Sequence, residues 1–204
     1  ILDSTFDGGE ISVSGGSCED SLNFIRASGF IRKISVQSSA NDAIDADFSR
    51  LDVKEIIVES AGNDCLDLSA GYYNLAEIKL SGCKDKALSA GERSRVAVHA
   101  AQISGSHIGF ATKDSSLLYL NEVQIDRSSV VICLDAHRKK QEYRGGVIVL
   151  KKDIGCTKNR VDAYSKIERN SHSTCLHVTE FNGVELCTQK DGIIYYYELE
   201  RPSG

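Results

Sequence analysis

The sequence predicts an all-β protein: a right-handed parallel β-helix of about six 22-residue coils with a small antiparallel cap at its C-terminal end. Two observations predict this fold. A short segment with an apolar third position recurs every 22 residues, and apolar pairs at i, i+2 spacing recur between its copies. The scarcity of proline, with Pro202 as the single one, also fits a β-helix. Every coil backbone must pair with the coils on both sides, and proline has no N–H to donate.

The recurring segment begins at residues 20, 42, 64, 86, 108 and 130. Its apolar third position holds, in turn, Leu22, Ile44, Leu66, Leu88, Phe110 and Ile132. Further pairs such as Leu51/Val53 and Ile56/Val58 have the spacing of a strand that buries one face. Each coil is therefore predicted to hold three short strands separated by Gly, Ser, Asn and Asp. Right-handedness follows from the general preference of parallel crossover connections.

The repeat pattern fades after about residue 150, so the β-helix is assigned to residues 1–150 and a cap to residues 151–204. Asn182-Gly183 lies between two alternating runs, 177–181 and 184–188, which predicts a β-hairpin. A third run follows at residues 193–197. We expect this element to pack on the solenoid and cover its open strand edges.

The composition narrows the possible partners. The 204 residues carry a formal charge of −5, which argues against nucleic acid as the default partner. No apolar run approaches the roughly 20 residues of a membrane span, so no membrane insertion is expected. The chain begins at Ile1 without Met, and we expect further domains before it. The seven Cys form no CxxC pair, which excludes zinc ribbons and leaves the disulfide state open, including a Cys175–Cys187 pairing.

Polar residues are expected to gather on one outer strip of the solenoid. Ile44, Ala46 and Phe48 alternate inward, so Asp45 and Asp47 face outward. The 22-residue step stacks equivalent positions of successive coils. The expected strip holds Asp42, Asp45, Asp47, Asp64, Asp67, Lys86, Ser89, Glu92 and Lys113.

Two interpretations of this strip stay open. Asp and Asn at the corners of a β-helix often stack to satisfy turn backbone groups, and Asn41 and Asn63 fit that role. Clustered carboxylates beside a Lys are also typical of acid/base glycoside chemistry. We expect no cofactor. The alternative is a Ca²⁺ ion held by Asp45, Asp47 and Asp67.

The segments Asn41–Asp45, Gly62–Asp67, Asp85–Gly91 and Gly109–Lys113 resemble the successive NTD, GDD, GHG and RIK motifs of polygalacturonases, glycoside hydrolase family 28 of the pectate-lyase-like superfamily. The resemblance implies that Asp42 and Asp64 match two of the family's acids. It also implies that Lys113 matches a lysine that contacts a substrate carboxylate.

The sequence departs from the family at three motif positions. Asn63 stands at the position of the family's proton donor, Lys86 replaces a His, and Ala111 replaces an Arg. An amide cannot protonate a leaving oxygen as a carboxylic acid does. A weaker similarity, in Asp85–Glu92 and Lys113–Ser116, is to β-helix domains of CotH-type (spore-coat kinase) proteins.

The resulting prediction is a polysaccharide-recognising domain that binds an acidic or complex glycan along the strip, in an extracellular or cell-envelope location. The first alternative is an active polysaccharide hydrolase or lyase. Its catalytic candidates are Asp42, Asp64, Asp67 and Lys86, and its substrate-binding candidates are Asp45, Asp47, Ser89, Glu92 and Lys113. In a lyase, Lys86 would need a depressed pKa to act as the base. The second alternative is a structural or adhesive solenoid module of a larger surface protein.

One basic run lies outside this strip. His137–Lys140, followed by Arg144, is interpreted as a solvated loop at the end of the solenoid, with an anion site as the alternative.

Overall fold

The structure is a computed structural model that describes residues 1–169, 177–181, 184–189 and 192–193. The described secondary structure consists of strands and contains no helix, so none of the described segments offers a helix able to cross a membrane. The chain divides into two compact units, Ile1–Arg169 and Asn170–Gly204. The first unit is a parallel β-solenoid of about eight turns, which confirms the predicted fold class.

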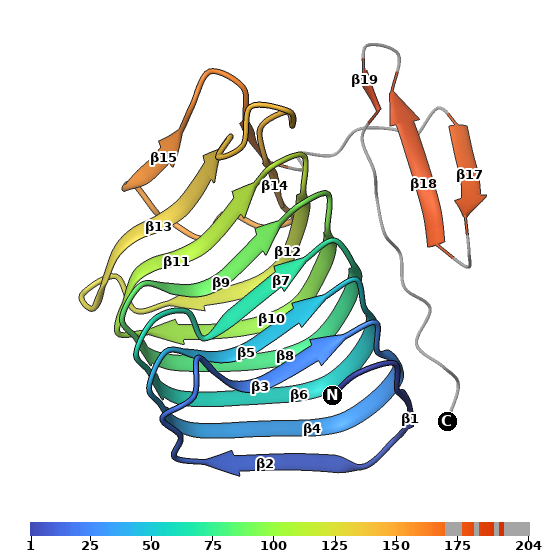
Figure 1. Cartoon of the computed structure of the whole chain (residues 1–204). Coiled ribbons are helices and arrows are strands. Elements are labelled where there is room, and N and C mark those ends of the chain that lie inside the picture. The colour runs from blue at the N-terminus through green and yellow to red at the C-terminus, as the bar shows by residue number, and fades with distance from the viewer. Residues whose placement is uncertain (170–176, 182–183, 190–191, 194–204) are drawn as a thin grey trace. The chain divides into compact units, whose positions relative to one another are not determined.

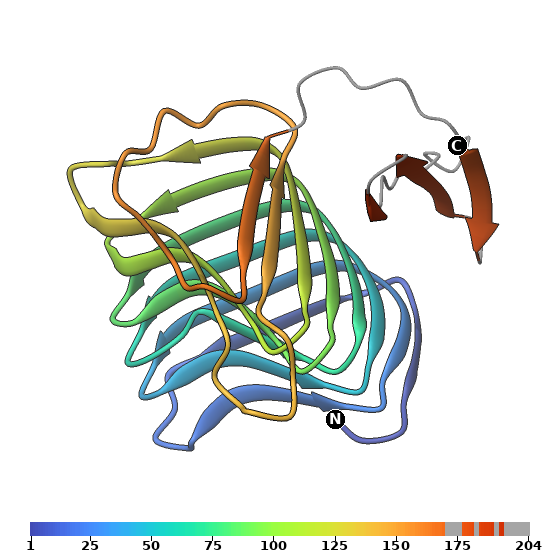
Figure 2. The same cartoon turned by 90° about the horizontal axis from the view of Figure 1, so that it is seen from above.

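Two parallel sheets make up the solenoid, and Figures 1 and 2 show their strands stacked coil upon coil. Sheet A contains β3 (Asp20–Ile25), β5 (Asp42–Asp47), β7 (Leu66–Ser69), β9 (Lys86–Gly91), β11 (Ser106–Lys113), β13 (Val130–His137) and β15 (Asn159–Val161). Sheet B contains β1 (Thr5–Asp7), β2 (Glu10–Ser14), β4 (Ser28–Ser39), β6 (Arg50–Ala61), β8 (Tyr72–Cys83), β10 (Arg95–Ser104), β12 (Leu117–Ile125), β14 (Val147–Leu150) and β16 (Lys166–Arg169).

The expectation of three short strands per coil is wrong. The pairs Leu51/Val53 and Ile56/Val58 both lie in the single strand β6, which bends between them. Their buried side chains change phase because Lys54 and Glu55, two consecutive residues, both turn away from the core. The backbone pairing omits only Lys54 at this bend, so the two expected strands form one.

The 22-residue step holds through most of sheet A and then lengthens. Ile44 pairs with Leu66, Leu66 with Leu88, and Leu88 with Phe110. Phe110 then pairs with Leu134, not with Ile132 as the repeat predicted. Beyond residue 150, β15 and β16 still pair in parallel with β13 and β14, so the solenoid continues to Arg169. The six expected coils were too few because the first and last turns depart from the 22-residue pattern.

Single non-glycine residues in the left-handed region turn the chain at the corners of the first coils, whereas the pairs Glu92/Arg93 and Asp114/Ser115 do so in later coils. After the sheet A strands the single residues are Arg26, Phe48 and Ala70, with φ of 52°, 51° and 51°. At the end of the sheet B strands, Ser38 and Ser60 have φ of 58° and 69°. The first of these corner rows borders the candidate site, because it follows directly on the outward-facing acids of sheet A.

Two disulfides lie within the buried core of the solenoid. Cys65 and Cys83, with Cα atoms 5.4 Å apart, are bridged within one coil, and Cys133 is bridged to Cys156. Cys65 is fully buried in its disulfide, so it offers no nucleophile. The side chains of Cys175 and Cys187 lie outside the described residues.

The second unit contains the predicted hairpin. β17 (His177–Phe181) pairs antiparallel with β18 (Val184–Gln189), and the pair Phe181–Val184 flanks Asn182-Gly183. β19 (Gly192–Ile193) adds to β18. The rest of the third predicted run, residues 194–197, lies outside the described residues, and the packing of the hairpin on the solenoid stays a prediction.

Candidate functional site

The outer face of sheet A carries three rows of mostly polar residues that run across the strands. The entry row, at the strand starts, is Asp20, Asp42, Asp64 and Lys86. The central row is Asn23, Asp45, Asp67, Ser89, Ala111, Asp135 and Arg160. The exit row is Asp47, Ser69 and Gly91, over which Lys113 lies. Equivalent residues stand one strand spacing apart, about 4.8 Å.

The entry row holds successive coils together. Asp42 Oδ1 accepts hydrogen bonds from Asn63 Nδ2 and from the backbone N–H of Asp64, each at 2.8 Å. Asp64, only 2% exposed, accepts the Lys86 backbone N–H at 2.9 Å and the Lys86 ammonium at 3.3 Å. This arrangement matches the structural interpretation of stacked corner residues.

The pKa shifts of the entry-row residues argue against Lys86 as the base of a lyase. Burial raises the pKa of Asp64 to about 6, although Lys86 opposes the shift. Burial alone would lower the pKa of Lys86, but its contacts with Asp85 and Asp64 outweigh burial and raise it. The pKa of Lys86 therefore moves in the direction opposite to the one a lyase base requires.

Asp45 and Asp47 form the part of the strip that lacks a cation. Asp45 is half-buried and accepts one hydrogen bond from Asn23 Nδ2 at 2.9 Å. Burial, with Asp47 and other nearby carboxylates, raises its pKa to about 7. Burial and Glu92 raise the pKa of Asp47 as well. Within the described part of the chain, neither residue forms an ion pair.

The side chain of Lys113 extends across the neighbouring coil toward Asp67. Its ammonium lies 3.5 Å from Asp67 Oδ2, two coils back, and its side chain is largely buried. It crosses Gly91, where an added Cβ would stand 2.7 Å from Lys113 Cε. The positive charge that the resemblance assigns to a substrate carboxylate is therefore held by Asp67. Ser89 lies beside Asp67 and is fully buried, and Glu92 pairs with Lys140 at the adjacent corner.

Exposed aromatic residues border the strip, and sequence reasoning missed them. Phe48 directly follows Asp47 and is 62% exposed, although alternation had placed it inward. Its φ of 51° turns its side chain out at the corner, in a conformation that is rare for a bulky residue. Tyr72, 53% exposed, lies in the next coil with the Arg50 guanidinium 5.6 Å from its ring centroid. The equivalent positions to Phe48 are Arg26 and Ala70, so an aromatic residue there was a detectable exception.

The Ca²⁺ alternative gains no support from the geometry. No group of three or more His, Cys, Asp or Glu suited to a metal ion occurs among the residues that the structure describes. Asp67 is paired with Lys113, which competes for one of the three expected ligands. The Ca²⁺ site stays a prediction.

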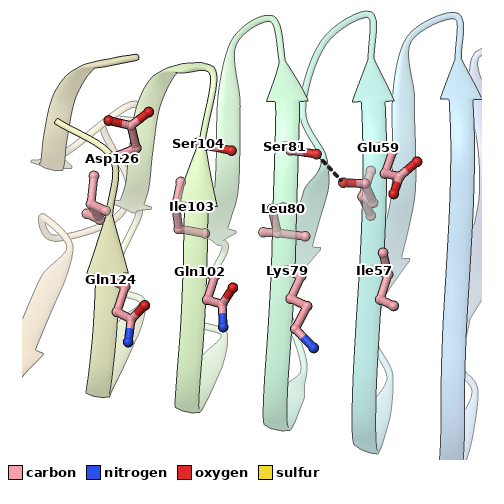
Figure 3. A pocket seen from close by; sticks show the side chains of 12 residues that line it. Ile57, Glu59, Lys79, Leu80, Ser81, Gln102, Ile103, Ser104, Gln124 and Asp126 are labelled. Atoms are coloured by element: carbon pink, nitrogen blue, oxygen red, sulfur yellow. Dashed lines mark hydrogen bonds between the residues drawn. The ribbon is translucent and has the colours of Figure 1, made fainter. Parts of the chain in front are cut away.

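A hollow lies on the outer face of sheet B, and Figure 3 shows it. It is a shallow groove of about 600 Å³ that crosses β6, β8, β10 and β12. Its side chains include Lys79, Gln102 and Gln124, and no aromatic residue lines it. Lys79 is engaged by Glu77 at 2.9 Å and Glu55 at 3.5 Å. A groove without a stacking surface is less suited to sugar rings than the strip beside Phe48.

The fold and this strip define the chain as a parallel β-solenoid with an acidic outer face. No protein-family model matches the chain, and no curated protein or solved structure matches it. The resemblance to polygalacturonases therefore rests on the motifs between residues 41 and 113.

Proposed function

We propose that the protein is a β-solenoid module that binds a polysaccharide along the outer face of sheet A. The observation that carries this proposal is the juxtaposition of Asp45 and Asp47, two carboxylates without a cation, with the exposed ring of Phe48. Carboxylates accept strong hydrogen bonds from hydroxyl groups, and aromatic rings stack on the apolar faces of sugars.

The charge of the strip defines the kind of sugar that fits it. Asp20, Asp42, Asp45 and Asp47 would repel a uronate at these coils, and Lys113 is engaged by Asp67. A neutral segment of the glycan is therefore the better ligand for this part of the strip. Equivalent polar residues recur about every 4.8 Å across the coils, so a glycan lying across them would meet polar groups at that interval.

The location follows from the same proposal. Two disulfides in the first unit favour an oxidising compartment, as is usual for a secreted or cell-envelope glycan-binding domain.

The test is binding to a panel of neutral polysaccharides by affinity electrophoresis and calorimetry. Phe48→Ala and Asp45→Asn/Asp47→Asn are expected to weaken binding about tenfold or more, the energy of one stacking contact or two hydrogen bonds. Phe30→Ala is the matched control, because Phe30 is an exposed aromatic residue on β4 of sheet B. Equal affinity of all variants, or no binding by the wild type, would refute the proposal.

The pKa of Asp45 favours a second candidate, hydrolysis of the bound glycan. A carboxyl group with a pKa near 7 remains partly protonated at neutral pH and can protonate a glycosidic oxygen. Asp67, one strand spacing of about 4.8 Å away in the central row, would be the nucleophile of a retaining mechanism, and water would then hydrolyse the glycosyl–enzyme intermediate. The assay is release of reducing ends at saturating glycan: Asp45→Asn abolishes release if Asp45 is the acid, a loss that the weaker binding expected of the Asp45→Asn/Asp47→Asn double cannot explain. Absence of release by the wild type on every bound glycan excludes this candidate.

A further inference from the structure

Charge is distributed unevenly along the first unit. Acidic side chains outnumber basic ones by more than two to one in residues 1–70, and basic ones outnumber acidic ones by the same margin in residues 137–169. The basic end includes the loop 138–146, which follows β13 at the same corner that Phe48 occupies several coils earlier.

This loop is fixed to the preceding coil through its backbone. The N–H groups of Lys139 and Lys140 both donate to Asp114 Oδ1 at 2.8 Å, and Asp114 is fully buried. The Arg144 N–H donates to Ser115 Oγ, also at 2.8 Å. Because these anchors use backbone donors, the loop keeps its place when its side chains change, and a ligand would bind with little further ordering cost.

The cations of the loop are held in a defined arrangement. The Arg138 guanidinium stacks 3.6 Å from the Tyr164 ring centroid, and Arg93 of the preceding corner lies 5.2 Å from the ring of Tyr143. Arg93, Lys139 and Arg144 are exposed to solvent.

Four carboxylates lie near these cations, and one of them is the buried Asp114 that anchors the loop. Lys140 pairs with Glu92, and Asp162 accepts the backbone N–H groups of Arg138 and Tyr164. Glu142, the acidic residue of the loop itself, is exposed. The exposed cations outnumber the acids that remain, so the surface is positive.

The basic loop and the Phe48 site belong to one continuous corner. The corner residues of successive coils are Phe48, Ala70, Glu92 and Asp114, and the loop follows at the next coil. Four coil steps separate Phe48 from the loop, about 19 Å along the solenoid. One extended polysaccharide can therefore span both, with its neutral part over the acidic coils.

We propose that the loop 138–146 binds anionic groups of the polysaccharide, so that the ligand is an acidic glycan bound in one direction along the corner. The direction of the bound glycan rests on the proposed function, whereas the anion site at the loop is independent of it. Carboxylate and sulfate groups share the chemistry that Arg and Lys recognise. A nucleic acid is a poorer fit, since its phosphates would lie against the acidic coils next to a few cations.

The test compares Lys139→Gln/Arg144→Gln with the control Lys54→Gln/Lys151→Gln. Both doubles remove two exposed positive charges, but the control changes positions outside the loop. The probes are polygalacturonate, chondroitin sulfate, the neutral glycan bound most tightly, and a single-stranded DNA oligonucleotide, each titrated at two salt concentrations. The two acidic glycans distinguish carboxylate from sulfate recognition.

The loop variant is expected to bind the acidic glycan about tenfold more weakly, with a smaller salt dependence, as two solvent-exposed ion pairs would give. The control is expected to bind like the wild type, and neutral-glycan binding to be unchanged in both doubles. An equal loss in the control, no binding of either acidic glycan, or tighter binding of the oligonucleotide would overturn the proposal. Phe48→Ala separates the two claims: if it leaves neutral-glycan binding intact, the proposed function fails while the anion site at the loop is still measured.

Discussion

Replacement of Asp45 by Asn is expected to stabilise the protein at neutral and alkaline pH. The folded-state pKa of Asp45 is about 7, above the 3.8 of a free Asp, because burial and nearby acids disfavour its charge. Between these two pH values the folded protein binds the proton that the unfolded chain has lost, so stability falls as pH rises from about 4 to 7. The substituted amide would keep the shape of the side chain and still accept the hydrogen bond from Asn23 without the charge.

The size of the effect follows from the shift. About three pKa units at 1.36 kcal/mol each give an upper bound of about 4 kcal/mol above pH 7. Asp45 is only half-buried, and solvent screening reduces this to about 1–2 kcal/mol. For a domain of this size the melting temperature would rise by about 3–8 °C.

The assay is thermal and urea unfolding of the wild type and Asp45→Asn at pH 4 and pH 8. The difference in unfolding free energy should be near zero at pH 4 and largest at pH 8. Asp52→Asn is the matched control, because it removes an exposed carboxylate from β6 of sheet B. A variant that is no more stable than the wild type at pH 8, or equally stabilised at both pH values, would refute the electrostatic reasoning.

Three further predictions concern the solenoid itself. Gly62→Ala should destabilise by about 3 kcal/mol in urea unfolding, because its Cβ would overlap a carbonyl oxygen of the preceding coil; an unchanged midpoint would contradict that packing. The Cys65→Ala/Cys83→Ala double should lose about 3 kcal/mol, the expected effect of opening an 18-residue loop, and thiol titration of the unreduced wild type should find these two cysteines blocked. Arg160→Gln should cost about 3 kcal/mol because the fully buried Asp135 would lose its closest cation, whereas Arg160→Lys should recover part of the loss.

Much of the fold could be predicted from the spacing of apolar residues. The constant step from Leu22 to Phe110 specified which residues stack, and the structure confirms that register. The step fails at β13, where Ile132 and Leu134 are both apolar and either could fill the same position. A shift of two residues keeps the same side chains inward, so the hydrophobic pattern cannot distinguish Ile132 from Leu134 at this position.

The site was predictable only in part. Alternation correctly turned Asp45 and Asp67 outward, since strand side chains have a period of two. The same rule turned Phe48 inward and failed, because the strand ends at Asp47 and the next residue takes a left-handed conformation. The pairing of Lys113 with Asp67 depends on a long side chain that crosses two coils, a contact that no spacing along the sequence specifies.

The central claim, that a polysaccharide lies on the corner beside the acidic strip, can be tested by fluorescence. The chain contains no Trp, so Phe48→Trp would place a single indole at the proposed stacking position. Titration with the neutral glycan bound most tightly should shift its emission to shorter wavelength and saturate at the measured affinity. Phe30→Trp, on sheet B, should not respond. An unchanged emission at position 48, or an equal change at both positions, would contradict the proposed binding site.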